Sequence, residues 1–321
     1  MTSLVLVVGA TGFIGRAITR ALLDRGASVR AGLYRSVLPP EFSNDPRVSV
    51  LHGGVTDEMN LEGVSAIIKA AHADRDSEAR LTALLDAASQ QAIRCVVYIS
   101  SIEVYGARQG AISEPDPPEP PLGAYGAIKL ADERRLADWA RAEPGRLAVA
   151  LRAGAVYGPG SFLWIDKMLA RIRSGAWGTF GNRGEGVAPL VHVDDLAAAA
   201  ADAALSPAAG WLPLNIVGDD CPAWNSYFRL VATCSGLPLD EIKPLSLGLR
   251  VAASYPAKMW RKLGGAGFEA AALAPTPGEL QIFARTARYR TDAARARLGW
   301  RPRRRLEEGV SAAVDEALRN G

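Results

Sequence analysis

The first two-thirds of the chain alternates short apolar runs with segments in which apolar residues recur every three or four positions. The two segments with helical spacing, at 15–26 and 78–91, predict amphipathic helices. Strands are predicted at 4–8, 27–36, 48–51, 66–70, 95–99 and 147–151. Continuous apolar strands separated by helices are typical of a parallel sheet covered on both faces. We therefore expect an α/β fold with a doubly wound, Rossmann-like parallel sheet.

The pattern becomes irregular after Gly158. Loops are predicted at 158–164 and 178–186, followed by a strand at 189–193 and a helix that Asp194 or Asp195 would cap. From Cys221 onward the chain is mostly helical, without alternation, and Trp211, Trp224, Tyr227 and Trp260 are expected in its core. We predict a dinucleotide-binding domain at 1–160 plus about 189–218, and a smaller, mostly helical substrate lobe at 161–188 and 219–321.

Composition narrows the class of protein. The 321 residues are 49% hydrophobic and 22% charged, with a net charge of +3, which is typical of a globular protein and too small to indicate a nucleic-acid partner. No apolar run approaches the roughly 20 residues of a membrane span, so no membrane partner is expected. The three cysteines form no C-x-x-C and no metal-ligand spacing, which favours a reduced, cytoplasmic protein without a metal site.

A glycine-rich loop follows the first predicted strand. Gly9, Gly12 and Gly15 stand where that strand turns into a helix. Glycines there allow a tight turn and let backbone N–H groups approach a pyrophosphate at the helix N-terminus. The second strand has no acid at its end to hold a ribose hydroxyl, while Arg30 and Arg35 flank it. Because arginine can bind a 2′-phosphate bidentately, NADP is favoured slightly over NAD.

Tyr125 and Lys129 are the candidate reactive pair. They lie four residues apart in "AYGAIKL", so a helix would place them on one face. A neighbouring cation favours the phenolate form and would lower the pKa of the tyrosine. Taken alone, the pair is equally compatible with a packed aromatic residue and a solvated lysine.

The motifs in chain order settle that choice. "GATGFIG", "SSIEVYG", "YGAIKL", "LRAGAVYGPG", "PLVHVDDLA" and "ARARLGWRP" resemble the extended short-chain dehydrogenase/reductases, the NAD(P)-dependent epimerase/dehydratase family. The resemblance implies hydride exchange with a carbonyl or secondary-alcohol carbon of a small molecule, a homodimer, Ser101 as the active-site hydroxyl, Tyr125 as catalytic base and Lys129 as its lysine. The cofactor contacts it implies are Gly9, Thr11, Gly12, Phe13, Ile14, Gly15, Arg35, Val55, Ala70, Ala71, Tyr125 and Lys129.

Departures from the family pattern bear on the reaction. Glu103 matches an acid that dehydratases use, so it is a possible acid–base group or a substrate contact, but its neighbour Ile102 is aliphatic. Ala188 and Pro189 replace the Arg-Asp pair of sugar-nucleotide epimerases, and the late R-x-G-D motif is missing. These departures favour a reductase or dehydrogenase. The alternative is a nucleotide-sugar epimerase with tightly held NAD. An inactive NAD(P)-sensing protein is disfavoured because the three reactive residues are intact.

Overall fold

The computed structural model describes residues 2–56, 59–71, 76–263 and 267–320. The strands are β1 (Leu4–Val8), β2 (Ser28–Leu33), β3 (Val48–His52), β4 (Val64–Lys69), β5 (Cys95–Ser101), β6 (Ala111–Ile112), β7 (Leu147–Ala153), β8 (Ala155–Tyr157), β9 (Leu190–His192), β10 (Gly210–Ile216) and β11 (Arg288–Tyr289). The helices are α1 (Phe13–Asp24), α2 (Pro40–Ser43), α3 (Ser77–Gln90), α4 (Ala124–Ala142), α5 (Lys167–Arg173), α6 (Val193–Ala204), α7 (Trp224–Ser235), α8 (Pro244–Lys262), α9 (Glu269–Leu273), α10 (Pro277–Phe283), α11 (Asp292–Leu298) and α12 (Leu306–Asn320). Short helical turns are η1 (Ile102–Tyr105), η2 (Phe162–Asp166) and η3 (Gly181–Gly184).

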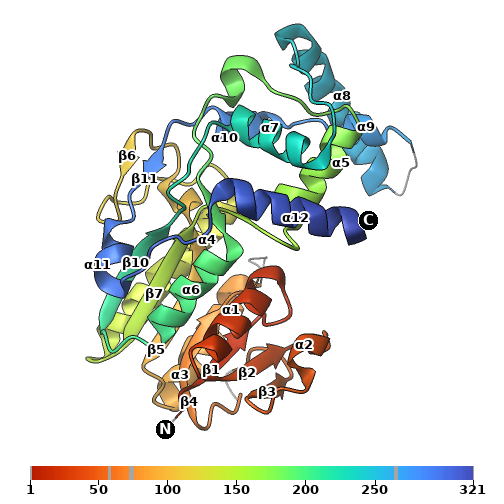
Figure 1. Cartoon of the computed structure of the whole chain (residues 1–321). Coiled ribbons are helices and arrows are strands. Elements are labelled where there is room, and N and C mark those ends of the chain that lie inside the picture. The colour runs from red at the N-terminus through yellow and green to blue at the C-terminus, as the bar shows by residue number, and fades with distance from the viewer. Residues whose placement is uncertain (1, 57–58, 72–75, 264–266, 321) are drawn as a thin grey trace.

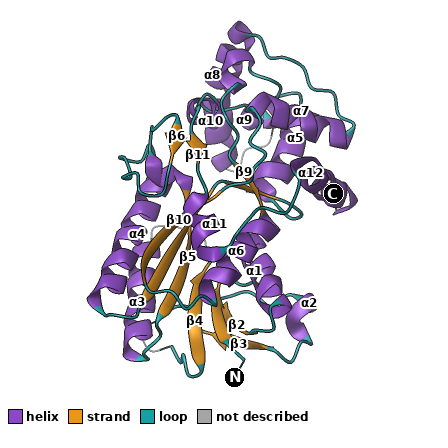
Figure 2. Ribbon diagram, turned by 60° about the vertical axis from the view of Figure 1, so that its left-hand side comes forward, coloured by secondary structure: helices purple, strands orange, loops and turns teal. Residues whose placement is uncertain are grey.

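The described residues form a seven-stranded parallel sheet in the order β10-β7-β5-β4-β1-β2-β3. The chain winds outward from β1 in both directions, with α1 and α6 on one face and α3 and α4 on the other (Figures 1 and 2). The predicted doubly wound Rossmann-like fold, with a mostly helical C-terminal region, is confirmed.

Alternate side chains of each central strand fill two separate cores. In β1, Val5 and Val7 pack in the cluster that contains Ile18 and Leu22 of α1. Leu6 points to the opposite face and packs in the cluster of α3 and α4. Because both faces of the strand are covered, the sequence of β1 is apolar throughout rather than alternating.

The C-terminal lobe has its own aromatic core. Rings from the segment after α5, from α7 and from α10 contact one another there. Trp177 packs edge-on against Phe180, Phe228 and Phe283 at centroid distances of 5.0–5.8 Å. Trp224 and Tyr227 are buried in the same cluster, as expected. This aromatic cluster is therefore separate from the two cores that flank the main sheet.

A small parallel sheet connects the lobe to the main domain. β6, from the loop after β5, pairs with β11, from the C-terminal segment, through Ala111–Arg288 and Ile112–Tyr289 (Figure 1). This pairing holds residues of the C-terminal segment beside the carboxyl end of β5. The end of β5 is where the predicted reactive residues lie.

Three local predictions require correction. The N-cap of α6 is His192, whose Nδ1 accepts the Asp194 N–H at 3.1 Å, because the Asp195 carboxylate instead accepts the N–H groups of Arg303 and Arg304. The two predicted loops contain the helical turns η2 and η3. Trp260 is not a core residue, because 51% of its surface is exposed.

No helix of the described residues is long and apolar enough to cross a membrane.

Candidate active site

The glycine loop forms a tight cradle between β1 and α1. Gly9 has φ +89°, in the left-handed region that favours glycine, and a Cβ on it would lie 2.8 Å from the Ala71 nitrogen. A Cβ on Gly15 would collide with the Gly9 carbonyl oxygen. Gly12, the N-cap of α1, offers no side-chain hydrogen bond to the first helical N–H groups. A glycine-rich loop that leads into a helix terminus without a side-chain cap fits the pyrophosphate of a dinucleotide.

Several of the residues predicted to contact the cofactor lie beside this cradle. The Ala70 N–H donates to the Val8 carbonyl at 2.9 Å, which places Ala70 and Ala71 directly against Gly9. The Thr11 and Ser36 hydroxyls are hydrogen-bonded at 3.0 Å, which ties the loop to the segment after β2. Val55 packs at the edge of the core on the α3 side of the sheet. These positions lie along the carboxyl edge of neighbouring strands, where ligands of open α/β sheets bind.

The two arginines predicted to flank the second strand differ in their surroundings, because Arg30 lies within β2 and only Arg35 lies beyond its end. Arg30 donates to the Asn60 carbonyl at 3.3 Å. Arg35 is exposed, with its guanidinium 4.8 Å from the Tyr34 ring centroid and Nη2 donating to the Tyr34 hydroxyl at 3.3 Å. Of the two, Arg35 is therefore placed beyond the end of β2, on the segment that contacts the glycine loop.

Ser101, Tyr125 and Lys129 come together at the end of β5. Helix α4 begins at Ala124, so Tyr125 lies in its first turn and Lys129 one turn later. Tyr125 is hydrogen-bonded to Ser101, and 44% of its surface is exposed. The Lys129 side chain is buried below it, 5.6 Å from the Tyr125 ring centroid, and donates to the Ile99 carbonyl at 2.7 Å. Tyr125 is thus accessible to solvent, whereas Lys129 is buried and held by its hydrogen bond to the Ile99 carbonyl.

Burial shifts the pKa values of both Tyr125 and Lys129. Burial raises the pKa of Tyr125, and the hydrogen bond with Ser101 opposes that rise. Burial lowers the pKa of Lys129 to about 7; the neighbouring Lys69 adds to this shift, whereas Asp132 and Glu133 oppose it. The predicted lowering of the tyrosine pKa is therefore wrong for the chain alone, since burial and the Glu103 carboxylate outweigh the Ser101 hydrogen bond.

A second buried ammonium lies next to Lys129. Lys69 at the end of β4 has its Nζ 4.0 Å from Asp132 Oδ2 and 5.0 Å from the Tyr98 ring centroid, and the Lys129 Nζ is 4.5 Å from the same ring. The Tyr98 hydroxyl donates to Asp132 Oδ2 at 2.6 Å. Sequence reasoning missed this network, although a lysine inside an otherwise apolar strand was a usable signal.

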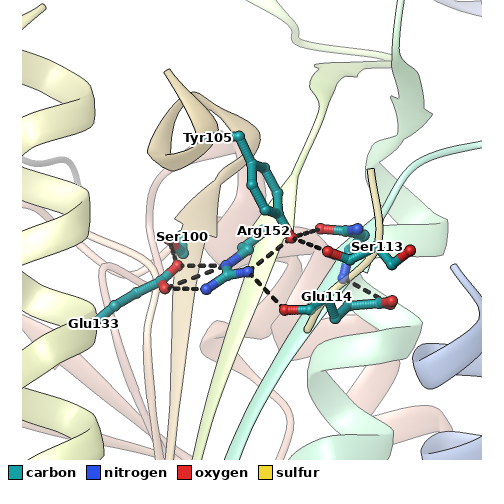
Figure 3. Close-up of polar contacts among 7 residues, drawn as sticks. Ser100, Tyr105, Ser113, Glu114, Glu133 and Arg152 are labelled. Carbon is teal, nitrogen blue, oxygen red and sulfur yellow. Dashed lines mark hydrogen bonds and ion pairs between the residues drawn. The ribbon is translucent and has the colours of Figure 1, made fainter. Parts of the chain in front are cut away.

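A separate polar network fixes the end of β5 to α4 (Figure 3). Arg152 of β7 binds both carboxylate oxygens of Glu133, with Nη2 at 2.8 Å and Nε at 3.1 and 3.2 Å. The Ser100 hydroxyl donates to the same carboxylate at 2.6 Å, and Arg152 Nη1 donates to the Tyr105 hydroxyl at 2.7 Å. The network holds the residue preceding Ser101 against the helix that carries Tyr125 and Lys129.

Glu103 is paired with a residue of the C-terminal segment. Arg285 donates from Nη1 to Oε1 at 2.8 Å and from Nη2 to Oε2 at 3.3 Å, and it is hydrogen-bonded to Tyr289 of β11. The Arg285 side chain is largely buried. Glu103 is therefore paired with a buried cation rather than with a surface one. Arg285 lies 182 positions along the chain from Glu103, and no local pattern in the sequence marks it.

Comparison with known proteins gives concordant matches. The model of the NAD dependent epimerase/dehydratase family matches residues 5–216. A ceramide reductase of Caulobacter vibrioides is 28% identical over 236 residues, which are 72% of this chain and 70% of that protein. A UDP-glucose 4-epimerase of Azospirillum brasilense is 31% identical over 167 residues, 46% of this chain and 47% of that protein. MoeE5, solved with UDP-glucuronic acid and NAD, is 25% identical and covers 98% of this chain and 99% of its own, with a TM-score of 0.72.

Proposed function

Because the chain belongs to the NAD-dependent epimerase/dehydratase family, we propose that it is an NAD(P)-dependent oxidoreductase that acts on a carbonyl or secondary-alcohol carbon of a small molecule. The observation that carries the proposal is the juxtaposition of Ser101, Tyr125 and Lys129 at the end of β5. The cofactor, when bound along the glycine loop, supplies or accepts the hydride.

Each reactive residue has a defined task in this proposal. In the direction of reduction, the Tyr125 hydroxyl gives its proton to the substrate oxygen, and in the direction of oxidation it takes that proton back. The Ser101 hydroxyl donates a hydrogen bond to the same oxygen and stabilises charge developing there. Lys129, in its ammonium form, stabilises the Tyr125 phenolate from below. Glu103 shapes the substrate side through its pair with Arg285 and is not assigned a proton-transfer role.

We assign the cofactor a preference for NADP on the basis of Arg35, which is exposed beside the segment that contacts the glycine loop. An acid at that position would repel a 2′-phosphate. Arg35→Asp should therefore weaken NADPH binding more than NADH binding, as measured by quenching of protein fluorescence. Equal effects on the two cofactors would remove Arg35 from the cofactor site.

The reductase reaction is favoured over epimerisation by two observations. The relative named a ceramide reductase aligns over 72% of this chain, whereas the UDP-glucose 4-epimerase aligns over 46%. Ala188 and Pro189 stand where epimerases of the family carry an Arg-Asp pair, whose arginine holds a diphosphate. The second candidate remains a nucleotide-sugar epimerase, which the full-length likeness to MoeE5 supports.

Cofactor handling distinguishes the two reactions. A reductase must exchange its cofactor in every turnover, whereas an epimerase returns the hydride to its substrate and retains NAD. We expect the purified protein to oxidise added NADPH in the presence of members of a panel of ketones and aldehydes. Tightly co-purified NAD, with no oxidation of NADPH by any member of the panel, would contradict the reductase assignment. A homodimer and a cytoplasmic location stay predictions, which light scattering and cell fractionation would test.

A further inference from the structure

Helix α8 (Pro244–Lys262) presents an apolar face to solvent. Leu245, Leu249, Met259 and Leu263 are 81%, 67%, 67% and 79% exposed. At 100° per residue, Leu245, Leu249 and Met259 fall on one side of the helix, and Leu263 directly follows its last residue. Figure 1 shows α8 at the end of the lobe farthest from the N-terminal strands. The apolar face is therefore a continuous stripe on an outer helix rather than a set of scattered side chains.

The opposite side of α8 is held by the lobe. Leu247, Ser254 and Ala257 are buried there. Arg250 donates to the Gly175 carbonyl, and Lys258 Nζ donates to the Ala274 carbonyl at 3.2 Å. Because one side of the helix is anchored in this way, the apolar stripe cannot be explained as the helix's own packing surface.

Aromatic residues extend the exposed surface. Tyr255 and Trp260 on α8 are more than half exposed, as is Phe268 immediately before α9. Tyrosine and tryptophan carry an apolar ring with a polar edge, a combination that suits the boundary between headgroups and acyl chains. Their exposure beside the leucine stripe is unusual for a surface that faces only water.

The charged residues of the same segment are all cations. Between Ile242 and Phe268 the sequence contains five cations and no acid, although the whole chain has 37 cations and 34 acids. The five cations are Lys243, Arg250, Lys258, Arg261 and Lys262. Lys243 and Lys262 stand exposed at the two ends of α8. Arg250 and Lys258 are hydrogen-bonded on the anchored side of α8, so Lys243 and Lys262 supply the exposed charge beside the stripe. A second copy of this face would bring these like charges together, whereas a surface of anionic lipid headgroups is complementary to them.

We propose that α8 docks the protein on the surface of a bilayer that contains anionic phospholipids. The leucine stripe lies at the boundary of headgroups and acyl chains, and the terminal lysines contact the headgroups. This revises the expectation that the protein has no membrane partner. A helix lying on a bilayer is distinct from one that spans it, so the absence of a spanning helix in the described residues is consistent with the proposal. The inference does not depend on the proposed oxidoreductase activity.

The test is sedimentation of the full chain with phospholipid vesicles. We expect binding to vesicles of phosphatidylcholine mixed with phosphatidylglycerol, weaker binding at high salt, and little binding to phosphatidylcholine alone. Leu249→Glu combined with Met259→Glu should abolish binding, because it places charge within the stripe. Lys243→Glu combined with Lys262→Glu should reduce partitioning by about tenfold or more. Leu318→Glu, an exposed leucine on α12, is the matched control and should bind like the natural chain.

A spectroscopic readout makes the contact specific to α8. The tryptophan emission of the natural chain should shift to shorter wavelength on vesicle binding, and Trp260→Phe should remove that shift while leaving sedimentation largely intact. The proposal is overturned if the chain does not bind the mixed vesicles, or if the Leu249 and Met259 double variant binds as well as the Leu318 control. It is also overturned if light scattering shows a dimer that the double variant dissociates, since the stripe would then be a protein interface.

Discussion

Asp132 and Glu133 are neighbours on helix α4, and each belongs to a buried polar network, yet the two networks differ in how fully they are satisfied. The Glu133 carboxylate accepts hydrogen bonds from two nitrogens of the Arg152 guanidinium and from the Ser100 hydroxyl. One oxygen of the Asp132 carboxylate accepts a hydrogen bond from the Tyr98 hydroxyl and lies 4.0 Å from the Lys69 ammonium, while its other oxygen has no hydrogen-bond partner among the residues that the structure describes.

The difference indicates two kinds of task. A guanidinium that binds both oxygens of a carboxylate holds the two side chains in one relative orientation. The Arg152–Glu133 pair therefore suits a structural connection between β7 and α4. A lysine is a point charge whose pKa shifts when buried, and Lys69 acts at a distance on Lys129. We therefore infer that the Glu133 network positions the end of β5, whereas the Asp132 network adjusts the charge of the reactive lysine. Substitutions of the buried cations test these assignments.

Removing the arginine should have the largest effect on stability. Arg152→Met leaves the buried Glu133 carboxylate without its cation, and breaking one partner of a buried ion pair costs roughly 3–5 kcal/mol. Urea unfolding followed by circular dichroism measures the loss. The double variant with Glu133→Gln should recover part of it, because the carboxylate charge is then absent. A loss below about 1 kcal/mol, the range of exposed pairs, would mean that the Glu133 network is not structural.

The ion pair between Arg285 and Glu103 should have an intermediate effect. It is less buried than the Glu133 pair, and losing hydrogen bonds to a charged group costs about 1.5–3 kcal/mol. We expect Arg285→Met to lower stability by that amount and to raise KM more than it lowers kcat, because the pair shapes the substrate side. Steady-state kinetics give the split. A selective loss of kcat would instead place Glu103 or Arg285 in the chemical step.

Replacing Lys69 should have a distinctive effect on the pH dependence of catalysis. Lys129 is reactive as an ammonium, so kcat/KM should fall as pH rises through about 7, where the lysine loses its proton. This fall is the alkaline limb of the pH profile. Because Lys69 lowers the Lys129 pKa, Lys69→Met should move this limb to higher pH, and Asp132 and Glu133 then act on Lys129 without the opposing cation. Lys69→Arg keeps the positive charge and should leave the limb in place. An unmoved limb in Lys69→Met would refute the tuning role.

Residues adjacent in sequence were predictable, and contacts between distant segments were not. The sheet, the glycine loop and the spacing of Tyr125 and Lys129 follow from local periodicity and turn chemistry, so the sequence carries them directly. Arg285 reaches Glu103 only because β6 pairs with β11, a contact that no local pattern specifies. Likewise, α8 is apolar on both sides, and only the packing of the lobe reveals which side is exposed.

The most direct test of the account is the Tyr125→Phe variant, which removes a single hydroxyl. If Tyr125 transfers the proton, kcat/KM should fall by about 10²- to 10⁴-fold. Cofactor affinity should stay nearly unchanged, because the ring and Lys129 remain in place. The measurement is NADPH oxidation with an active carbonyl substrate, together with a cofactor titration. A variant that retains near-normal rates would contradict the assignment of the site.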